Sequence, residues 1–225
     1  MNYKIIESVS SGNATIVEDI ILVDCGVSFK KLHDYYKNLK LVLLTHTHSD
    51  HFNKTTIKRL AQERPTLRFG CRDWLVNDLV MCGVDRKNID IYDSVSNFKY
   101  SNNLILATFD LQHDVPNCGY KIMINDKKYF YATDTCSLEN IEAKDYDMYF
   151  IEGNYEDKAE LDMRKQKHIE KGEFYYEDRV EKTHLSQVAA TEWLMKNMGD
   201  KSQYIFMHEH KERESRKEVE WCKLN

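Results

Sequence analysis

The segment 45–51, Thr-His-Thr-His-Ser-Asp-His, gathers three histidines and one carboxylate into a short stretch of the chain. Alternate residues of a tight loop can point to one side, so His46 and His48 can converge on one ion, and Asp50 and His51 can face a second. Neutral imidazole and carboxylate are the ligands that zinc and other first-row divalent ions prefer. Because the chain has only nine histidines, a merely solvated loop explains this density poorly, and we interpret the segment as a metal-binding loop.

Three more candidate ligands each follow an apolar stretch that predicts a buried strand. His113 follows the strand expected at 104–112, Asp134 the strand at 128–133, and His208 the strand at 203–207. Because active sites of layered α/β proteins gather at strand ends, we expect these side chains to meet the histidine-rich loop. His210 offers an alternative to His208, which we favour because it directly follows the apolar strand.

The elements that must position these residues can be predicted from periodicity and turn residues. Four consecutive apolar residues at 41–44 indicate a strand buried on both faces. Further strands are expected at 3–7, 14–18, 20–24, 66–70, 89–92, 104–112, 120–125, 128–133, 146–152 and 203–207, and helices after Ser28 and at 55–64, 72–82, 185–198 and 211–225. A meander followed by alternating helices and strands, occurring twice, predicts an α/β fold of two sheets packed face to face with helices outside.

The composition and charge of the chain exclude several classes of protein. The 225 residues carry a formal charge of -5, with 42% hydrophobic and 31% charged residues, which argues for one folded domain over 1–225 and against disorder or a histone-like coating of nucleic acid. No apolar run approaches the length of a membrane span. Glu7 interrupts any signal-peptide core, and six scattered cysteines without a C-x-x-C pair suit a reducing compartment. We therefore expect a cytoplasmic protein that does not enter the membrane.

The motif His46-x-His48-x-Asp50-His51, followed by the three downstream ligands, resembles the metallo-β-lactamase superfamily over almost the whole chain. The resemblance implies a four-layer αββα sandwich. It also implies two divalent metal ions, zinc first with manganese or iron as alternatives. The implied ligands are His46, His48 and His113 for the first ion, Asp50, His51 and His208 for the second, and Asp134 as a bridge between them. Asp24 would orient the ligand loop from behind.

Two ions sharing a hydroxide would make a hydrolase, with Asp50 orienting the water or accepting its proton. Thr183-His184-Leu185-Ser186 resembles the extra histidine motif of the nuclease branch, seen in ribonuclease Z and the small YycJ-like (WalJ-like) proteins. In that branch the histidine gives a proton to the leaving oxygen. A polar helix start is the plainer interpretation of the same four residues. Glu152 lies in a stretch that resembles the group's acid-containing strand end, which implies a carboxylate that bonds His184; the alternative is a strand-end acid facing solvent.

The sequence predicts the type of reaction more narrowly than it predicts the substrate. A nucleic acid or a small phosphodiester is our first expectation, and the alternatives are a thioester or lactone substrate of glyoxalase II type or a metal-binding protein without activity. Only 21 residues separate His113 from Asp134, which leaves no room for the tRNA-gripping arm of ribonuclease Z. Acidic and basic residues alternate over 155–183, which is typical of a solvated helix and loop rather than a nucleic-acid stripe. A homodimer and a monomer are both compatible with the sequence.

Overall fold

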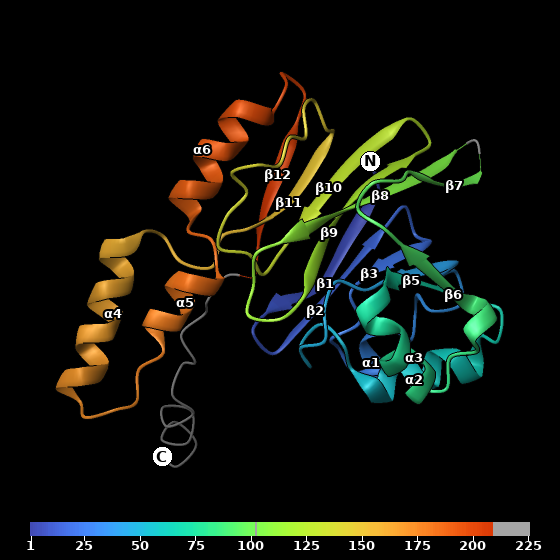
Figure 1. Ribbon diagram of the computed structural model, residues 1–225, viewed down its shortest axis with the longest axis horizontal. Helices are drawn as coiled ribbons and strands as arrows, with labels where there is room; N and C mark the ends of the chain where they lie inside the picture. The colour runs from blue at the N-terminus through green and yellow to red at the C-terminus, as the bar shows by residue number, and fades with distance from the viewer. Residues whose placement is uncertain (102, 209–225) are drawn as a thin grey trace, which may run out of the picture.

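The computed structural model describes residues 1–101 and 103–208, and in them the strands form two six-stranded sheets packed face to face (Figure 1). The first sheet has the order β1 (Tyr3–Val9), β2 (Gly12–Val17), β3 (Ile21–Val23), β4 (Leu41–Leu43), β5 (Arg68–Arg72) and β6 (Ile89–Tyr92). The second has the order β12 (Gln203–Met207), β11 (Met148–Glu152), β10 (Lys127–Ala132), β9 (Asn117–Ile124), β8 (Leu104–Leu111) and β7 (Phe98–Ser101).

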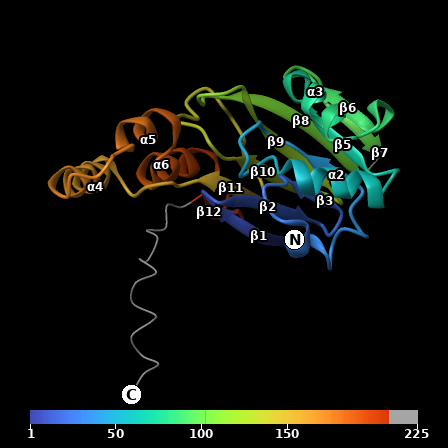
Figure 2. The same cartoon turned by 90° about the horizontal axis from the view of Figure 1, so that it is seen from below.

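Helices cover the outer face of each sheet. The first sheet carries α1 (Phe29–Leu32), α2 (Lys54–Glu63) and α3 (Val76–Met81), with short 3-10 turns at Asp73–Leu75 and Arg86–Asn88. The second sheet carries α6 (Gln187–Asn197). Figure 2 shows α4 (Lys158–Glu170) and α5 (Glu177–Thr183) extending from one end of the sandwich. The expected α/β fold with four αββα layers is therefore confirmed.

The alternation of side chains along the central strands explains the layers. On β4, Leu41 and Leu43 belong to the core between the sheets, whereas Val42 faces the helices of the first sheet. On β10, Tyr131 faces the same inner core, whereas Phe130 stacks on Trp193 of α6 with ring centroids 4.9 Å apart. Both faces of these strands are buried, so an unbroken apolar run is what their position requires.

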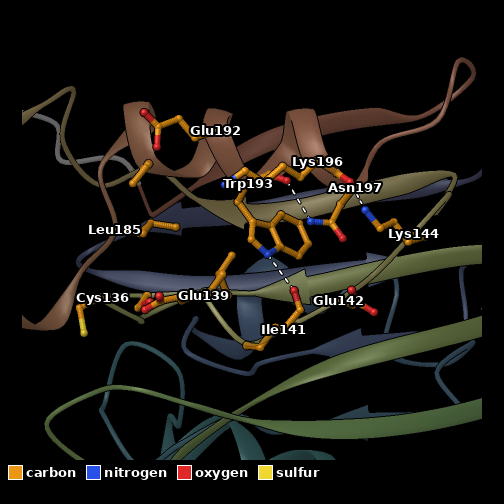
Figure 3. Close-up of a pocket in the computed structure, with 13 residues that line it drawn as sticks. Cys136, Glu139, Ile141, Glu142, Lys144, Leu185, Glu192, Trp193, Lys196 and Asn197 are labelled. Atoms are coloured by element: carbon orange, nitrogen blue, oxygen red, sulfur yellow. Dashed lines mark hydrogen bonds between the residues drawn. The ribbon is translucent and has the colours of Figure 1, made fainter.

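Two hydrogen bonds fasten α6 to the loop that follows β10. The indole Nε1 of Trp193 donates to the carbonyl of Ile141 over 2.9 Å (Figure 3). Oδ1 of Asn197 accepts from the amide of Ala143 over 2.9 Å. The side chain of Ser186 caps the helix by accepting from the amide of Ala189. The bonds of Trp193 and Asn197 fix the C-terminal half of α6 to the loop after β10.

A few local expectations were wrong. The hairpin between β9 and β10 turns at Asn125 and Asp126, whose φ values of 49° and 63° fit a type I′ turn, one residue earlier than predicted. Strand β7 was missed, and β12 is an edge strand with two exposed residues rather than a fully buried one. The helix expected at 211–225 lies outside the described residues. No helix in the described part of the chain has the length and apolar character needed to span a membrane.

Candidate metal centre

The first cluster of candidate ligands joins the loop after β4 to the residue that follows β8. His46, His48 and His113 each offer a ring nitrogen, and these three atoms lie within 4.8 Å of one another. Nε2 of His113 is 3.3 Å from Nδ1 of His48. Residues that are 65 positions apart in the chain thus meet where two strands end. We call this group the first cluster.

The second cluster consists of Asp50, His51 and His208, whose ligand atoms also lie within 4.8 Å of one another. Oδ2 of Asp50 is 3.5 Å from Nε2 of His51 and 3.6 Å from Nε2 of His208. His208 follows β12 at the edge of the second sheet, so this cluster draws on both sheets. His210, the alternative ligand, lies outside the described residues.

Asp134, which follows β10, lies between the two clusters. Its Oδ2 is 2.9 Å from Nε2 of His51, and its Oδ1 is 4.0 Å from Nε2 of His113. The carboxyl group is buried, with 2% of its side chain exposed. Its position is the one that a residue shared by two ions would need.

The chemistry of the donor atoms fits metal ions. Among the described residues, Nε2 of His46, Nε2 of His208 and Oδ2 of Asp134 are buried and have no hydrogen-bond partner. The contact between Asp134 and His51, although short, does not meet the geometry of a hydrogen bond. Leaving a buried polar atom unsatisfied costs about 1–3 kcal/mol, so three such atoms aimed at one region indicate groups placed to bind metal ions.

Each ligand candidate of the loop has a partner on its other ring nitrogen. Thr45 Oγ1 donates to Oδ1 of Asp24, so its oxygen accepts from Nδ1 of His46 over 2.9 Å. Nδ1 of His51 donates to Oδ2 of Asp24 over 2.7 Å. Nε2 of His48 lies 3.3 Å from Oδ1 of Asp114. These partners occupy the second nitrogen of each ring, so that Nε2 of His46 and His51 and Nδ1 of His48 are the nitrogens that could bind an ion.

The remaining histidines follow the same pattern. Nδ1 of His113 donates to the carbonyl of Thr183 over 3.0 Å, which leaves its Nε2 free toward the first cluster. Nδ1 of His208 lies 3.3 Å from Oε1 of Glu152. The buried carboxylates and carbonyls behind the ligands therefore orient the rings as those behind metal-bound histidines do.

Burial and neighbouring charge separate the pKa values of the two clusters. Burial, reinforced by the neighbouring rings of His51 and His113, holds the pKa of His46 well below its usual value. Burial also lowers the pKa of His113, so both imidazoles are neutral, as a ligand must be. Burial alone would lower the pKa of His208 too, but the charge of Asp134 and the nearby carboxylates of Asp50 and Glu152 raise it to about 10. The second cluster is therefore a place of strong negative potential that attracts a cation.

Three site residues adopt left-handed backbone conformations. Asp24, Asp134 and His208 have φ values of 59°, 57° and 56°, and each directly follows or closely follows a strand. Such conformations cost non-glycine residues of order 1–3 kcal/mol each. Their concentration at one edge of the sandwich is typical of a functional site.

Opposite the clusters, His184 and Glu152 form a buried pair. Nδ1 of His184 lies 2.6 Å from Oε1 of Glu152, whose Oε2 accepts from the amide of Thr135 over 2.7 Å. Burial would lower the pKa of His184, but the Glu152 carboxylate outweighs it and raises that pKa. Nδ1 of His184 is also 3.8 Å from Oδ1 of Asp134, so this pair adjoins the candidate ligands.

Members of both clusters, together with Asp134 and His184, open into one pocket of about 280 Å³. It is lined by Ser10, His48, Asp50, His113, Asp134, Asn154, Tyr176, Arg179, Val180, Thr183, His184 and His208. A second pocket of about 370 Å³ lies between α6 and the loop after β10, around Trp193 (Figure 3), and contains none of the candidate ligands. The first pocket is therefore the candidate reaction site.

Several residues of the site were not predicted. Nδ2 of Asn13 lies 3.2 Å from Oδ2 of Asp50 and 2.9 Å from Nε2 of His51, and Nδ2 of Asn154 donates to the carbonyl of His208. Each amide follows a glycine at a strand end, in Ser-Gly-Asn and Glu-Gly-Asn, and this shared pattern could have drawn attention to them. Arg179 could not be recognised as a site residue from the sequence, because it is one basic residue within a stretch where acidic and basic residues alternate.

Comparison with known proteins agrees with the fold. The model of the β-lactamase superfamily domain matches residues 20–208. No curated protein matches the chain. The metallo-β-lactamase fold protein YhfI from Bacillus subtilis is 15% identical with a TM-score of 0.68, over 93% of this chain and 86% of that protein. The short form of human tRNase Z is 12% identical with a TM-score of 0.69, over 94% and 93%. Zn²⁺-bound PqqB from Methylobacterium extorquens is 13% identical with a TM-score of 0.63, over 93% and 88%.

Proposed function

This chain belongs to the β-lactamase superfamily, and from that premise we propose that it is a two-metal hydrolase that cleaves phosphodiesters, as a nuclease does. The observation that carries the proposal is the pairing of His184 with the buried carboxylate of Glu152 at 2.6 Å, beside the candidate ligands. Hydrolysis of a thioester needs no such proton donor, because a thiolate leaves readily. Cleavage of a phosphodiester expels a basic alkoxide, which does need one.

The first cluster would hold one ion and the second cluster the other, with Asp134 between them. Two divalent ions in such a site lower the pKa of water and offset the charge that develops on a phosphate. Zinc is the metal we propose, because the donors are mostly imidazole. Manganese and iron are the alternatives.

His184 would donate the proton to the leaving oxygen. Its Nδ1 is held by Glu152, so its other nitrogen, Nε2, is the one available to the substrate. The Glu152 carboxylate raises the pKa of His184 against the effect of burial. The ring is therefore protonated over a wider range of pH than a free histidine, which suits a general acid.

Asp50 would orient or deprotonate the attacking water. Burial would raise its pKa, but the neighbouring imidazoles of His208 and His51 outweigh burial and lower it. Its carboxylate is therefore ionised at neutral pH. Asn13 steadies it, because Nδ2 of that residue lies 3.2 Å from Oδ2.

The experiment that tests the proposal is metal-dependent cleavage of an oligonucleotide by the purified protein, with a thioester assayed beside it. We expect cleavage that a chelator abolishes and that zinc restores. His48→Ala removes one ligand of the first cluster from a half-exposed position, so it should lose metal and activity while the protein stays folded by circular dichroism. Turnover of the thioester alone, or unchanged cleavage by the His48→Ala protein, would refute a phosphodiesterase.

A further inference from the structure

Arg179 lies at the rim of the reaction pocket, on the side formed by α5. Its guanidinium donates from Nε, over 3.1 Å, and from Nη2 to the same oxygen of Asp114, Oδ2. The hydrogen bonds of the described residues use only these two nitrogens, so Nη1 makes none among them. The side chain is 67% exposed, so its free edge is open to a ligand.

The carboxylate of Asp114 links this guanidinium to the first cluster. Its other oxygen, Oδ1, is 3.3 Å from Nε2 of His48 and 3.2 Å from Nε2 of His113. One short side chain therefore separates Arg179 from two candidate ligands. The backbone of α5 is fixed as well, because the carbonyl of Thr183, one helical turn later, accepts from His113. Arg179 is held close to the place where a phosphate would meet the ions.

The charge of the site calls for such a cation. Five carboxylates surround the clusters, and the charges of two divalent ions and of a protonated His184 would only balance them: Asp24, Asp50, Asp114, Asp134 and Glu152. A phosphodiester is an anion, and a centre without a surplus of positive charge would attract it weakly. Arg179 supplies positive charge at the open side of the pocket.

We propose that Arg179 binds the phosphate group of the substrate and selects anionic phosphodiesters over uncharged esters. The assignment rests on the proposed function and deepens it. A planar guanidinium with its orientation fixed by Asp114 can offer its remaining donors to two phosphate oxygens, which the point charge of a lysine cannot do. Ordering by Asp114 also reduces the entropy lost when the phosphate binds.

The test compares three variants of the zinc-loaded protein by calorimetric titration with inorganic phosphate and by steady-state cleavage of an oligonucleotide. Arg179→Gln removes the charge but keeps an amide that can donate a hydrogen bond to Asp114. Arg179→Lys keeps the charge but lacks the planar set of donors of a guanidinium. Lys182→Gln is the matched control, because Lys182 is exposed on the same helix and does not line the pocket. Zinc content is measured for each.

A charge-assisted hydrogen bond contributes enough to change a binding constant by roughly 10- to 100-fold. We expect Arg179→Gln to weaken phosphate binding by that factor and to raise KM more than it lowers kcat. Arg179→Lys should lie between it and the wild type, and Lys182→Gln should match the wild type. Turnover of p-nitrophenyl acetate, an uncharged ester, should be the same in all of them.

Equal phosphate affinity in the wild type and Arg179→Gln, or an equal loss in Lys182→Gln, would overturn the assignment. So would a wild type that binds no phosphate. A wild type that binds phosphate through Arg179 but cleaves no phosphodiester would support the assignment while the proposed function fails, so the two ideas can be refuted separately.

Discussion

Replacement of His184 gives the sharpest test of the mechanism, because the expected loss depends on the leaving group. A positioned general acid typically contributes 10²- to 10⁴-fold to the rate, or about 3–5 kcal/mol of barrier. That contribution applies only when the leaving oxygen is basic. We therefore expect His184→Ala to slow cleavage of an oligonucleotide by that factor and to leave cleavage of bis(p-nitrophenyl) phosphate nearly unchanged, since p-nitrophenolate leaves without a proton.

The structure also sets the control for this variant. Removing His184 takes the 2.6 Å partner from Glu152, which is buried and keeps the amide of Thr135 and Nδ1 of His208 as partners. Part of any loss in His184→Ala could thus come from a disturbed second cluster. His184→Gln preserves a donor toward Glu152 but cannot release a proton, so it should show the same dependence on the leaving group.

The role of His184 is tested by measuring the rates of the wild type and the His184 variants on both substrates. The zinc concentration is held constant, and the zinc content of each protein is matched. An equal loss on the two substrates would mean that His184 organises the site and does not donate a proton. No loss on either would remove His184 from the mechanism and favour the thioester or lactone alternative.

The remaining predictions concern the groups that hold the ligand loop. Asp24→Asn should reduce zinc affinity by roughly 10- to 100-fold, because the buried carboxylate accepts from His51 and from the amide and hydroxyl of Thr45. Titration with a competing chelator measures the affinity for zinc. Unchanged affinity would show that Asp24 does not orient His51. Gly26→Ala should unfold the loop or the protein, since the added Cβ would lie 1.6 Å from the carbonyl oxygen of Asp50. Thermal unfolding measures this, and a melting temperature equal to that of the wild type would contradict the close approach of these two segments.

Much of the fold was encoded in contiguous residues. The strand β4 could be predicted from four apolar residues in a row because both of its faces are buried, and such a position tolerates no polar side chain. The metal-binding character of the loop that follows β4 could also be predicted, since the residue type and spacing of His46, His48 and His51 are typical of metal ligands. Short exposed elements such as β7 carry a weak pattern, because little burial selects their residues.

Contacts between distant segments could not be predicted in the same way. Asp114 and Arg179 belong to the site only because α5 lies against the loop after β8, and nothing in their local sequence distinguishes them from other polar residues. Their roles depend on where two sheets and a helix end relative to one another. The downstream ligands were indicated by their positions after predicted strands and by the family resemblance, and the tertiary structure brought their atoms together.

The sequence by itself determined the kind of chemistry, because side-chain type and spacing are local properties that fix which ligands a loop offers. Tertiary structure alone decided the tautomer of each histidine, the left-handed backbone at Asp24, Asp134 and His208, and the guanidinium at the open side of the pocket. These are set by packing and hydrogen bonding between segments that can be more than a hundred residues apart, and no short stretch of sequence contains that information.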